Sequence, residues 1–252
     1  MLHYTRILIG QKLAASDGEI GHVKDFLYDD LNWVLRYLVV DTGNWLVGRS
    51  VLIAPQAIGS IEIGEKALPV KLRRSQIERA PALESHLPVS RQYEIDYYQY
   101  YGWPAYWAGG ELWGLGAVPT TNLPPPILPE KRVPVRHRSE KHLQSVLDTV
   151  GYRVEGLDGD VGRLEGFLFD DHDWAVAEVV IEAGHWYAGH EVRVSRRNIR
   201  GITHEHRALT IDLRRADIQR AREDEIARHP GEPLPRILRH PRVAENPVGK
   251  KH

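Results

Sequence analysis

The chain contains one stretch of sequence twice, and this duplication constrains its fold more than any other feature. The segment DGEIGHVKDFLYDDLNWVLRYLVVDTGNW begins at Asp17, and a second copy, DGDVGRLEGFLFDDHDWAVAEVVIEAGHW, begins at Asp158. Trp174 follows Trp33 by 141 positions (174 − 33), and the same shift relates Ile218 to Ile77 without a gap. Self-similarity at a fixed shift indicates repeated structural units. The sequence therefore predicts two copies of one domain.

Composition divides the chain into four parts. The first repeat is assigned to residues 1–80 and the second to residues 143–228. Residues 81–142 form a linker with a helix at 90–101 and a Gly/Pro-rich segment, and residues 229–252 form a proline-rich charged tail. With 252 residues, the chain has room for two domains of ordinary size.

Each repeat has the pattern of a small β unit. Asp17-Gly18 predicts a hairpin turn, because glycine accepts the positive φ that tight turns require. Residues 28–32 predict a second turn, and residues 33–40 predict a strand that is apolar on both faces. Further short strands are expected at VLIA, IGSIEI and ALPVKL, and Ser75-x-x-Glu78 is expected to cap a brief helix that Pro81 closes. The fold class predicted for both repeats is all-β, each a small closed barrel with a short terminal helix.

The strings DGEIGHVKDFLYDD, WVLRYLVVDTGNWL and VLIAPQAIG resemble the PRC-barrel family, which is named for the photosynthetic reaction-centre H subunit and shared with ribosome-maturation factors. Both repeats show the resemblance, over residues 2–80 and 143–221. It implies two tandem PRC-type barrels. It implies no chemistry, because the family shares no catalytic residues.

The linker and the end of the second repeat carry further helix signals. Ser90 is expected to cap the linker helix and Gly102 to end it. Its tyrosines at 93, 97 and 101 share one face. In the second repeat Arg222 replaces Pro81, so the terminal helix is predicted to continue to about Arg228.

The overall composition argues against several classes of protein. Lysine plus arginine (33) nearly balance aspartate plus glutamate (34), so nucleic-acid binding is not expected. The absence of cysteine excludes disulfides and cysteine-ligated metals and suits a reducing compartment. Neither a signal peptide nor an apolar run of about 20 residues is found, so a cytoplasmic bacterial protein is predicted.

No residue pattern predicts catalysis, a metal or a cofactor. The pairs Asp29-Asp30 and Asp170-Asp171 lack the dense oxygen ligands of a calcium loop and are expected to form turns. His204 and His206 could supply half of a zinc site, but the first repeat has no equivalent pair. Residues 48–52 lack the second glycine of a nucleophile elbow, and glycines 109–116 do not form a dinucleotide fingerprint.

Repeated and clustered aromatic residues are the strongest signal in the sequence for a functional surface. Trp33/Trp174 and Trp45/Trp186 recur at matched positions, and residues 93–113 hold a dense set of tyrosines and tryptophans. The repeated tryptophans are interpreted as core, whereas the linker aromatics fit either packing or a docking surface. The candidate inter-repeat or partner interface comprises Trp33, Leu35, Arg36, Tyr37, Trp174, Val176, Glu178, Tyr97, Tyr101, Trp103 and Trp107.

The two repeats are expected to pack together as an intramolecular pseudo-dimer, because an apolar strand face needs a partner. Arg36 and Glu178, which differ between the copies, are predicted to pair across that contact. The function predicted is a non-catalytic interaction or scaffold module with an unknown protein partner, and further oligomers remain open. The alternative is an RNA-associated accessory factor, by analogy with the ribosome-maturation proteins.

Overall fold

The computed structural model describes residues 1–43, 45–46, 49–62, 64–81, 89–121, 143–187 and 189–228. The predicted Gly/Pro-rich stretch beyond 121 and the tail at 229–252 lie outside these residues. The first part of the chain forms β1 (Leu2–Tyr4), α1 (Thr5–Leu8), β2 (Lys12–Ala15), β3 (Gly18–Asp29), β4 (Val34–Asp41), β5 (Ser50–Ile53), the 3-10 turn η1 (Pro55–Ala57), β6 (Ala67–Pro69), α2 (Arg74–Glu78) and α3 (Arg91–Tyr101). The second part forms β7 (Leu143–Ser145), α4 (Val146–Thr149), β8 (Arg153–Gly156), β9 (Gly159–Asp170), β10 (Val176–Ala183), η2 (His185–Tyr187), β11 (Glu191–Ser195), η3 (Arg196–Asn198), β12 (Ile199–Thr203), β13 (Ala208–Ile211) and α5 (Arg215–Arg228).

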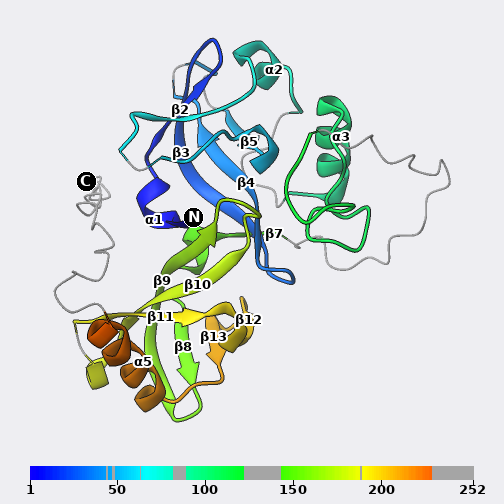
Figure 1. The fold of residues 1–252 in the computed structure, drawn as a ribbon. Coiled ribbons are helices and arrows are strands. Elements are labelled where there is room, and N and C mark those ends of the chain that lie inside the picture. Colours follow the sequence, from blue (N-terminus) through cyan, green and yellow to red (C-terminus); the bar gives the residue numbers. More distant parts are fainter. Residues whose placement is uncertain are drawn as a thin grey trace, which may run out of the picture.

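The described strands form two sheets, so the described part of the chain is dominated by β structure. One sheet has the order β5-β4-β3-β2-β6, and the other has the order β11-β10-β9-β8-β13-β12. We call the parts built on them lobe 1 and lobe 2; Figure 1 shows lobe 1 above and lobe 2 below. The hairpin indicated by Asp17-Gly18 forms, but its two-residue loop is Ser16 and Asp17, and Gly18 is the first residue of β3.

Each lobe includes one strand that comes from the other repeat. β1, at the start of the first repeat, pairs with β9 of lobe 2, and β7, at the start of the second repeat, pairs with β3 of lobe 1. The registers are equivalent, since Leu2 lies opposite Asp170 and Leu143 lies opposite Asp29. The sequence boundaries of the repeats therefore do not coincide with the boundaries of the lobes.

The exchanged segments are held by different side chains in the two lobes. In lobe 1 the carboxylate of Asp25 accepts hydrogen bonds from the Ser145 hydroxyl and the Leu147 amide. In lobe 2 the equivalent position is Gly166, and a Cβ there would meet the ring of Tyr4. The amide of Phe167 instead donates to the Thr5 hydroxyl. The copies have thus diverged while keeping the same exchange.

The two lobes meet where β4 and β10 begin. Val34 and Ala175 form an antiparallel bridge, flanked by hydrogen bonds from the Leu35 amide to the Trp174 carbonyl and from the Val176 amide to the Trp33 carbonyl. The two bonds are equivalent, because Leu35 corresponds to Val176 and Trp33 corresponds to Trp174 in the two repeats. We call this contact the seam, and an approximate two-fold axis passes through it.

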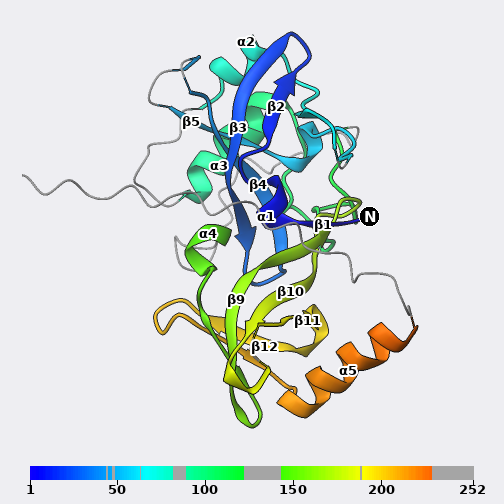
Figure 2. The same cartoon turned by 90° about the vertical axis from the view of Figure 1, so that its left-hand side faces the viewer.

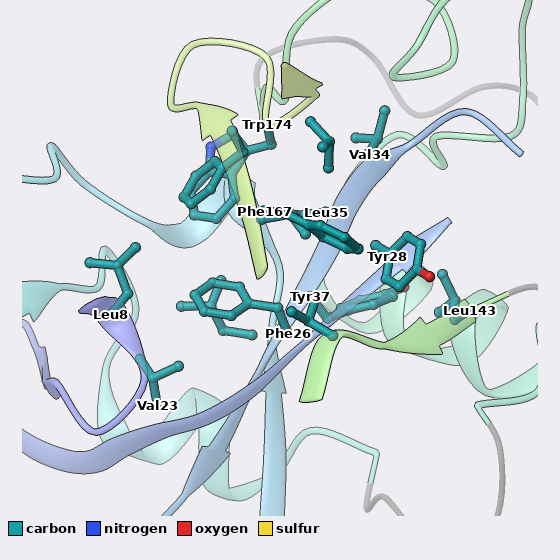
Figure 3. Close-up of a cluster of buried hydrophobic side chains, with 14 of the residues drawn as sticks. Leu8, Val23, Phe26, Tyr28, Val34, Leu35, Tyr37, Leu143, Phe167 and Trp174 are labelled. Carbon is teal, nitrogen blue, oxygen red and sulfur yellow. The ribbon is translucent and has the colours of Figure 1, made fainter. Parts of the chain in front are cut away.

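One hydrophobic core runs through both lobes across the seam. The ring of Tyr28 meets that of Phe167 edge-on at 5.0 Å, and Phe26 contacts Phe169 at 6.1 Å. These two contacts are again exchanged by the axis. Figure 3 shows Phe167 and Trp174 of lobe 2 in one cluster with Leu35 and Tyr28 of lobe 1. The lobes therefore share their apolar interior instead of folding as separate domains.

The terminal helix of each repeat is capped by the hairpin turn of the same repeat. The carboxylate of Asp17 accepts from the Arg74 amide, and that of Asp158 accepts from the Arg215 amide. The predicted cap at Ser75 is wrong, because the helix begins at Arg74 and the Gln76 side chain accepts from the Arg73 amide. α2 ends at Glu78, before Pro81, whereas α5 continues to Arg228 as predicted. Figure 2 shows α5 along the outside of lobe 2.

Two expectations about the strands need correction. The hydrogen-bonded ladders among the described residues leave both sheets open, with β5 and β6, or β11 and β12, at opposite ends. The strand expected at residues 58–63 is reduced to a bridge between Ile58 and Val70. Its equivalent, β12, forms a ladder with β13 that has one irregularity, and Thr210 of β13 pairs with Gly201. Pro69 stands at the Thr210 position in lobe 1 and has no N–H to donate to the ladder.

The linker helix forms as predicted. The Ser90 hydroxyl accepts from the Tyr93 amide at the start of α3, and Gly102 ends the helix in the left-handed conformation. Tyr93, Tyr97 and Tyr101 lie on one face with their rings in contact. We call residues 89–121, α3 and the chain after it, the strap; Figure 1 shows it beside lobe 1.

Candidate interaction site

The predicted interface residues separate into two groups in the structure. Trp33, Leu35, Trp174 and Val176 lie at the seam and contribute its backbone hydrogen bonds. The other group lies between lobe 1 and the strap: Arg36, Tyr37, Tyr97, Tyr101, Trp103 and Trp107. Glu178 belongs to neither group, because it lies on β10 opposite Ser195 and Leu168.

Trp33 and Trp174 are buried as predicted, and both have an unusual backbone. Their φ angles are 58° and 60°, in the left-handed region that bulky residues avoid. Each Trp amide donates to the carbonyl of the residue four positions earlier, Asp29 or Asp170. Each Trp carbonyl accepts the bond that crosses the seam. The backbone strain therefore lies in two equivalent turns, each of which directs a Trp carbonyl to the other lobe across the seam.

The other repeated pair, Trp45 and Trp186, is only half-buried against the core. The Trp186 indole donates to the Val161 carbonyl, and the Arg74 guanidinium lies over the Trp45 ring. The prediction that all four repeated tryptophans are largely buried holds only for the pair at the seam.

Arg36 is buried in lobe 1 and binds both lobe 1 and the strap. It pairs with the Asp29 carboxylate at 3.2 Å and donates to the Leu112 carbonyl of the strap at 2.6 Å. Its guanidinium also lies over the rings of Tyr106 and Trp113. The predicted pairing with Glu178 is wrong, because the charge of Arg36 is neutralised within its own lobe.

Asp29 also shapes the turn that precedes Trp33. Its carboxylate accepts from the amides of Leu31 and Asn32 and from the Asn32 side chain, which confirms the predicted turn chemistry. Burial opposes the charged form, but the Asn32 amide and the Arg36 guanidinium outweigh it and hold the pKa of Asp29 below its usual value. Asp29 therefore remains an anion beside a buried cation.

A buried carboxylate that the sequence did not single out fixes the strap to lobe 1. Glu94 of α3 is 0 % exposed and accepts from the hydroxyls of Tyr37 at 3.1 Å and Tyr106 at 2.7 Å. Arg91, one helical turn earlier, pairs with it at 2.9 Å. Burial, with the charge of Glu94, raises the pKa of Tyr37 and of Tyr106. The i, i+3 spacing of Arg91 and Glu94 was visible in the sequence, but nothing there placed Tyr37 against them.

The strap also satisfies the outer edge of β5. The Tyr97 hydroxyl donates to the Leu52 carbonyl and accepts from the Ala54 amide, each at 3.1 Å. Beside it, the Gln56 amide donates weakly to the Tyr98 hydroxyl. A tyrosine from α3 thus takes the hydrogen-bonding groups that an edge strand otherwise leaves open.

The strap reaches the seam through its second half. The Trp113 indole donates to the Asp173 carbonyl at 2.7 Å, immediately before Trp174. Trp103 is buried and stacks on Tyr101 with ring centroids 4.5 Å apart, whereas Trp107 is half-buried. Of the two interpretations of the linker aromatics, internal packing describes most of these residues.

The equivalent face of lobe 2 has no tyrosine-rich helix over it among the described residues. Glu178 stands where lobe 1 has Tyr37, and Ser195 and Arg197 stand where it has Ala54 and Gln56. Glu178 and Ser195 are partly buried and Arg197 is exposed. The divergence of Arg36-Tyr37 into Ala177-Glu178 therefore reflects the strap, which covers lobe 1, and not an ion pair at the seam.

His204, considered above as half of a zinc site, instead joins the lobes. Its imidazole contacts the Asp30 carboxylate of lobe 1 at 3.0 Å and the Tyr152 hydroxyl at 3.3 Å. Within the described ranges, no three histidine, aspartate or glutamate side chains gather closely enough to hold a metal ion. Likewise, none of the described helices is both long and apolar enough to cross a membrane.

No protein-family model matches this chain, and no curated protein matches it in sequence.

Proposed function

We propose that the chain is a non-catalytic protein-interaction or scaffold module, built from two PRC-type units, whose partner is another cytoplasmic protein. Support for the PRC-type assignment is the repeated sequence pattern itself. Support for a scaffold role comes from the strand exchange, which joins the lobes into one body through a shared core.

The observation that carries the proposal is the break in symmetry between the lobes. The strap occupies one face of lobe 1, and its polar groups are used internally by Glu94, Arg36 and Tyr97. The equivalent face of lobe 2 has Glu178 and Ser195 in place of Tyr37 and Ala54, and Arg197 in place of Gln56. We assign the partner to this second face.

Site-directed photo-cross-linking in the native host tests the assignment. Benzoylphenylalanine replaces Glu178 on the proposed face, and, as a matched control, Lys12, which is exposed on β2 of lobe 1. A discrete protein adduct from position 178 and none from position 12 is expected. Adducts from both positions or from neither contradict the assignment. An adduct that contains RNA favours the RNA-associated alternative.

A further inference from the structure

The composition of this chain limits which side chains a one-electron oxidant can attack. The protein has no cysteine and a single methionine, Met1, but 11 tyrosines and seven tryptophans. Thiols and thioethers are the side chains that oxidants ordinarily modify first. Here phenols and indoles are the main oxidisable groups, and nine of them lie between residues 93 and 113.

The strap arranges these rings as a continuous chain of contacts. Trp107, which is half-buried, lies 4.8 Å from Tyr106 between ring centroids. From Tyr106 the contacts pass to Tyr98 at 6.0 Å, to Tyr97 at 5.8 Å, to Tyr101 at 4.9 Å, and to Tyr100 at 4.8 Å. Tyr100 is 41 % exposed. The buried phenols therefore connect with the surface at two points.

Oxidation of a phenol also requires a group that takes its proton, because the oxidised ring is a strong acid. Tyr106 donates its hydroxyl proton toward the Glu94 carboxylate at 2.7 Å, and Tyr37 does so at 3.1 Å. Glu94 is 0 % exposed, so this acceptor lies within the protein and not in bulk water. By contrast, no carboxylate of the described residues accepts a hydrogen bond from the buried hydroxyl of Tyr28.

We propose that the strap is a one-electron oxidation site in which Tyr106 is the redox-active phenol and Glu94 its proton acceptor. The co-reactant is a one-electron oxidant at the surface beside Trp107. The oxidant gains one electron, which leaves the Tyr106 ring by way of the Trp107 ring. The Tyr106 O–H bond breaks, and its proton moves to the Glu94 oxygen. The products are a neutral tyrosyl radical, a neutral Glu94 carboxylic acid and the reduced oxidant. Return of an electron reverses both transfers.

Arg91 holds the groups of this site in place and neither gains nor loses a proton or an electron in the step. Its guanidinium pairs with Glu94 and contacts the Tyr106 hydroxyl at 3.3 Å. It also lies over the Trp107 ring at 4.3 Å. Arg91 is therefore a positioning residue that holds the donor, the acceptor and the entry ring together.

Flash photolysis of the full chain with tris(bipyridine)ruthenium and a sacrificial electron acceptor tests the proposal. The photogenerated ruthenium(III) complex is the one-electron oxidant, and transient absorption and electron paramagnetic resonance detect the tyrosyl radical. The wild-type chain is expected to form the radical more slowly in D2O than in H2O, because a proton moves with the electron. Glu94→Gln is expected to slow radical formation at least about tenfold.

Tyr28→Phe is the matched control, since it removes a buried phenol that lacks a carboxylate acceptor. It is expected to leave the radical yield unchanged. Equal radical yield and rate in wild type and Glu94→Gln would overturn the proposal. If circular dichroism shows that Glu94→Gln is unfolded, Tyr106→Phe decides, because it keeps the carboxylate. Loss of the radical in Tyr106→Phe supports the site, and an undiminished radical there overturns it.

Discussion

At the scale of single residues, buried charges determine how the strap sits on lobe 1. Arg36 and Glu94 are 1 % and 0 % exposed, and each also binds a partner that is distant in sequence. Arg36 reaches Leu112, and Glu94 reaches Tyr37. Removing one partner of a buried charge is costly, because the remaining charge has lost its solvation and its counter-ion. These residues therefore make the position of the strap specific.

The Asp29–Arg36 pair is expected to make stability depend on pH in the acid range. The pKa of Asp29 is lowered in the folded state, so its contribution is present above the unfolded value and is lost as the pH falls through the folded value. The contribution of Asp29 to the free energy of unfolding should therefore decrease as the pH falls below the usual value of 3.8 toward the lower folded value. Asp29→Asn should weaken this dependence and cost about 3–5 kcal/mol at neutral pH.

Urea unfolding of wild type and Asp29→Asn at several pH values measures both effects. Asp160→Asn is the matched control, because Asp160 is about half exposed and lies 3.9 Å from Arg163. A midpoint for Asp29→Asn equal to that of the control would show that the buried pair contributes nothing.

At the scale of elements, sequence patterns located the strands and helices whose signals are local. The hairpin after β2 and the cap at Ser90 required only neighbouring residues. The extension of α5 past Arg222 required a comparison with Pro81 in the first repeat. Two errors came from contacts that local patterns do not contain. Asp17 in the β2–β3 turn caps α2, which lies 57 residues later. Pro69, which has no N–H, stands in the segment that would pair with the expected strand at 58–63.

The repeated glycines at the start of β3 and β9 show why these long strands can pair closely. Gly21 and Gly162 have φ angles of 135° and 155°. A Cβ at Gly162 would collide with the Glu182 carbonyl, and one at Gly21 with the Asp41 carbonyl. Gly162→Ala should therefore separate β9 from β10 and cost about 4 kcal/mol or more.

Thermal unfolding of Gly162→Ala checks this, with Gly201→Ala as the control. A Cβ at Gly201 would meet nothing within 4 Å, and its φ is not positive, so a change close to zero is expected there. Equal melting temperatures for the two variants would mean that the strand contact tolerates a side chain.

At the scale of the whole molecule, the strand exchange makes two repeats into one folding unit. β1 and β9 are separated by more than half the chain, yet their pairing has the same register as that of β7 with β3. The seam adds a bridge between Val34 and Ala175 and a pair of reciprocal backbone hydrogen bonds. Neither lobe is complete without a segment of the other repeat.

An engineered disulfide tests this arrangement directly. The flanking bonds from Leu35 and Val176 make Val34 and Ala175 a non-hydrogen-bonded pair, in which Cα atoms lie about 4.5 Å apart. This lies within the range of about 4.4–6.8 Å that disulfides span. Because the chain has no cysteine, Val34→Cys with Ala175→Cys should oxidise to one intramolecular bond.

Electrophoresis without reductant should show a monomer of shifted mobility, in a yield that does not depend on protein concentration. Val34→Cys alone provides the control for intermolecular bonds. Covalent dimers as the main product of the double variant would instead place the two strands in different molecules.

The sequence by itself determined the duplication, the β class and the two ends of the linker helix, because these depend on repeated side chains and on neighbours along the chain. It also indicated correctly that Trp33 and Trp174 lie in the core. Only the tertiary structure decided that β1 and β7 are exchanged between the lobes and that Arg36 binds Asp29. It also decided that Glu94 accepts hydrogen bonds from two tyrosine hydroxyls. Three-residue strands and buried polar pairs leave no periodic pattern, since their partners are chosen by packing across the whole molecule.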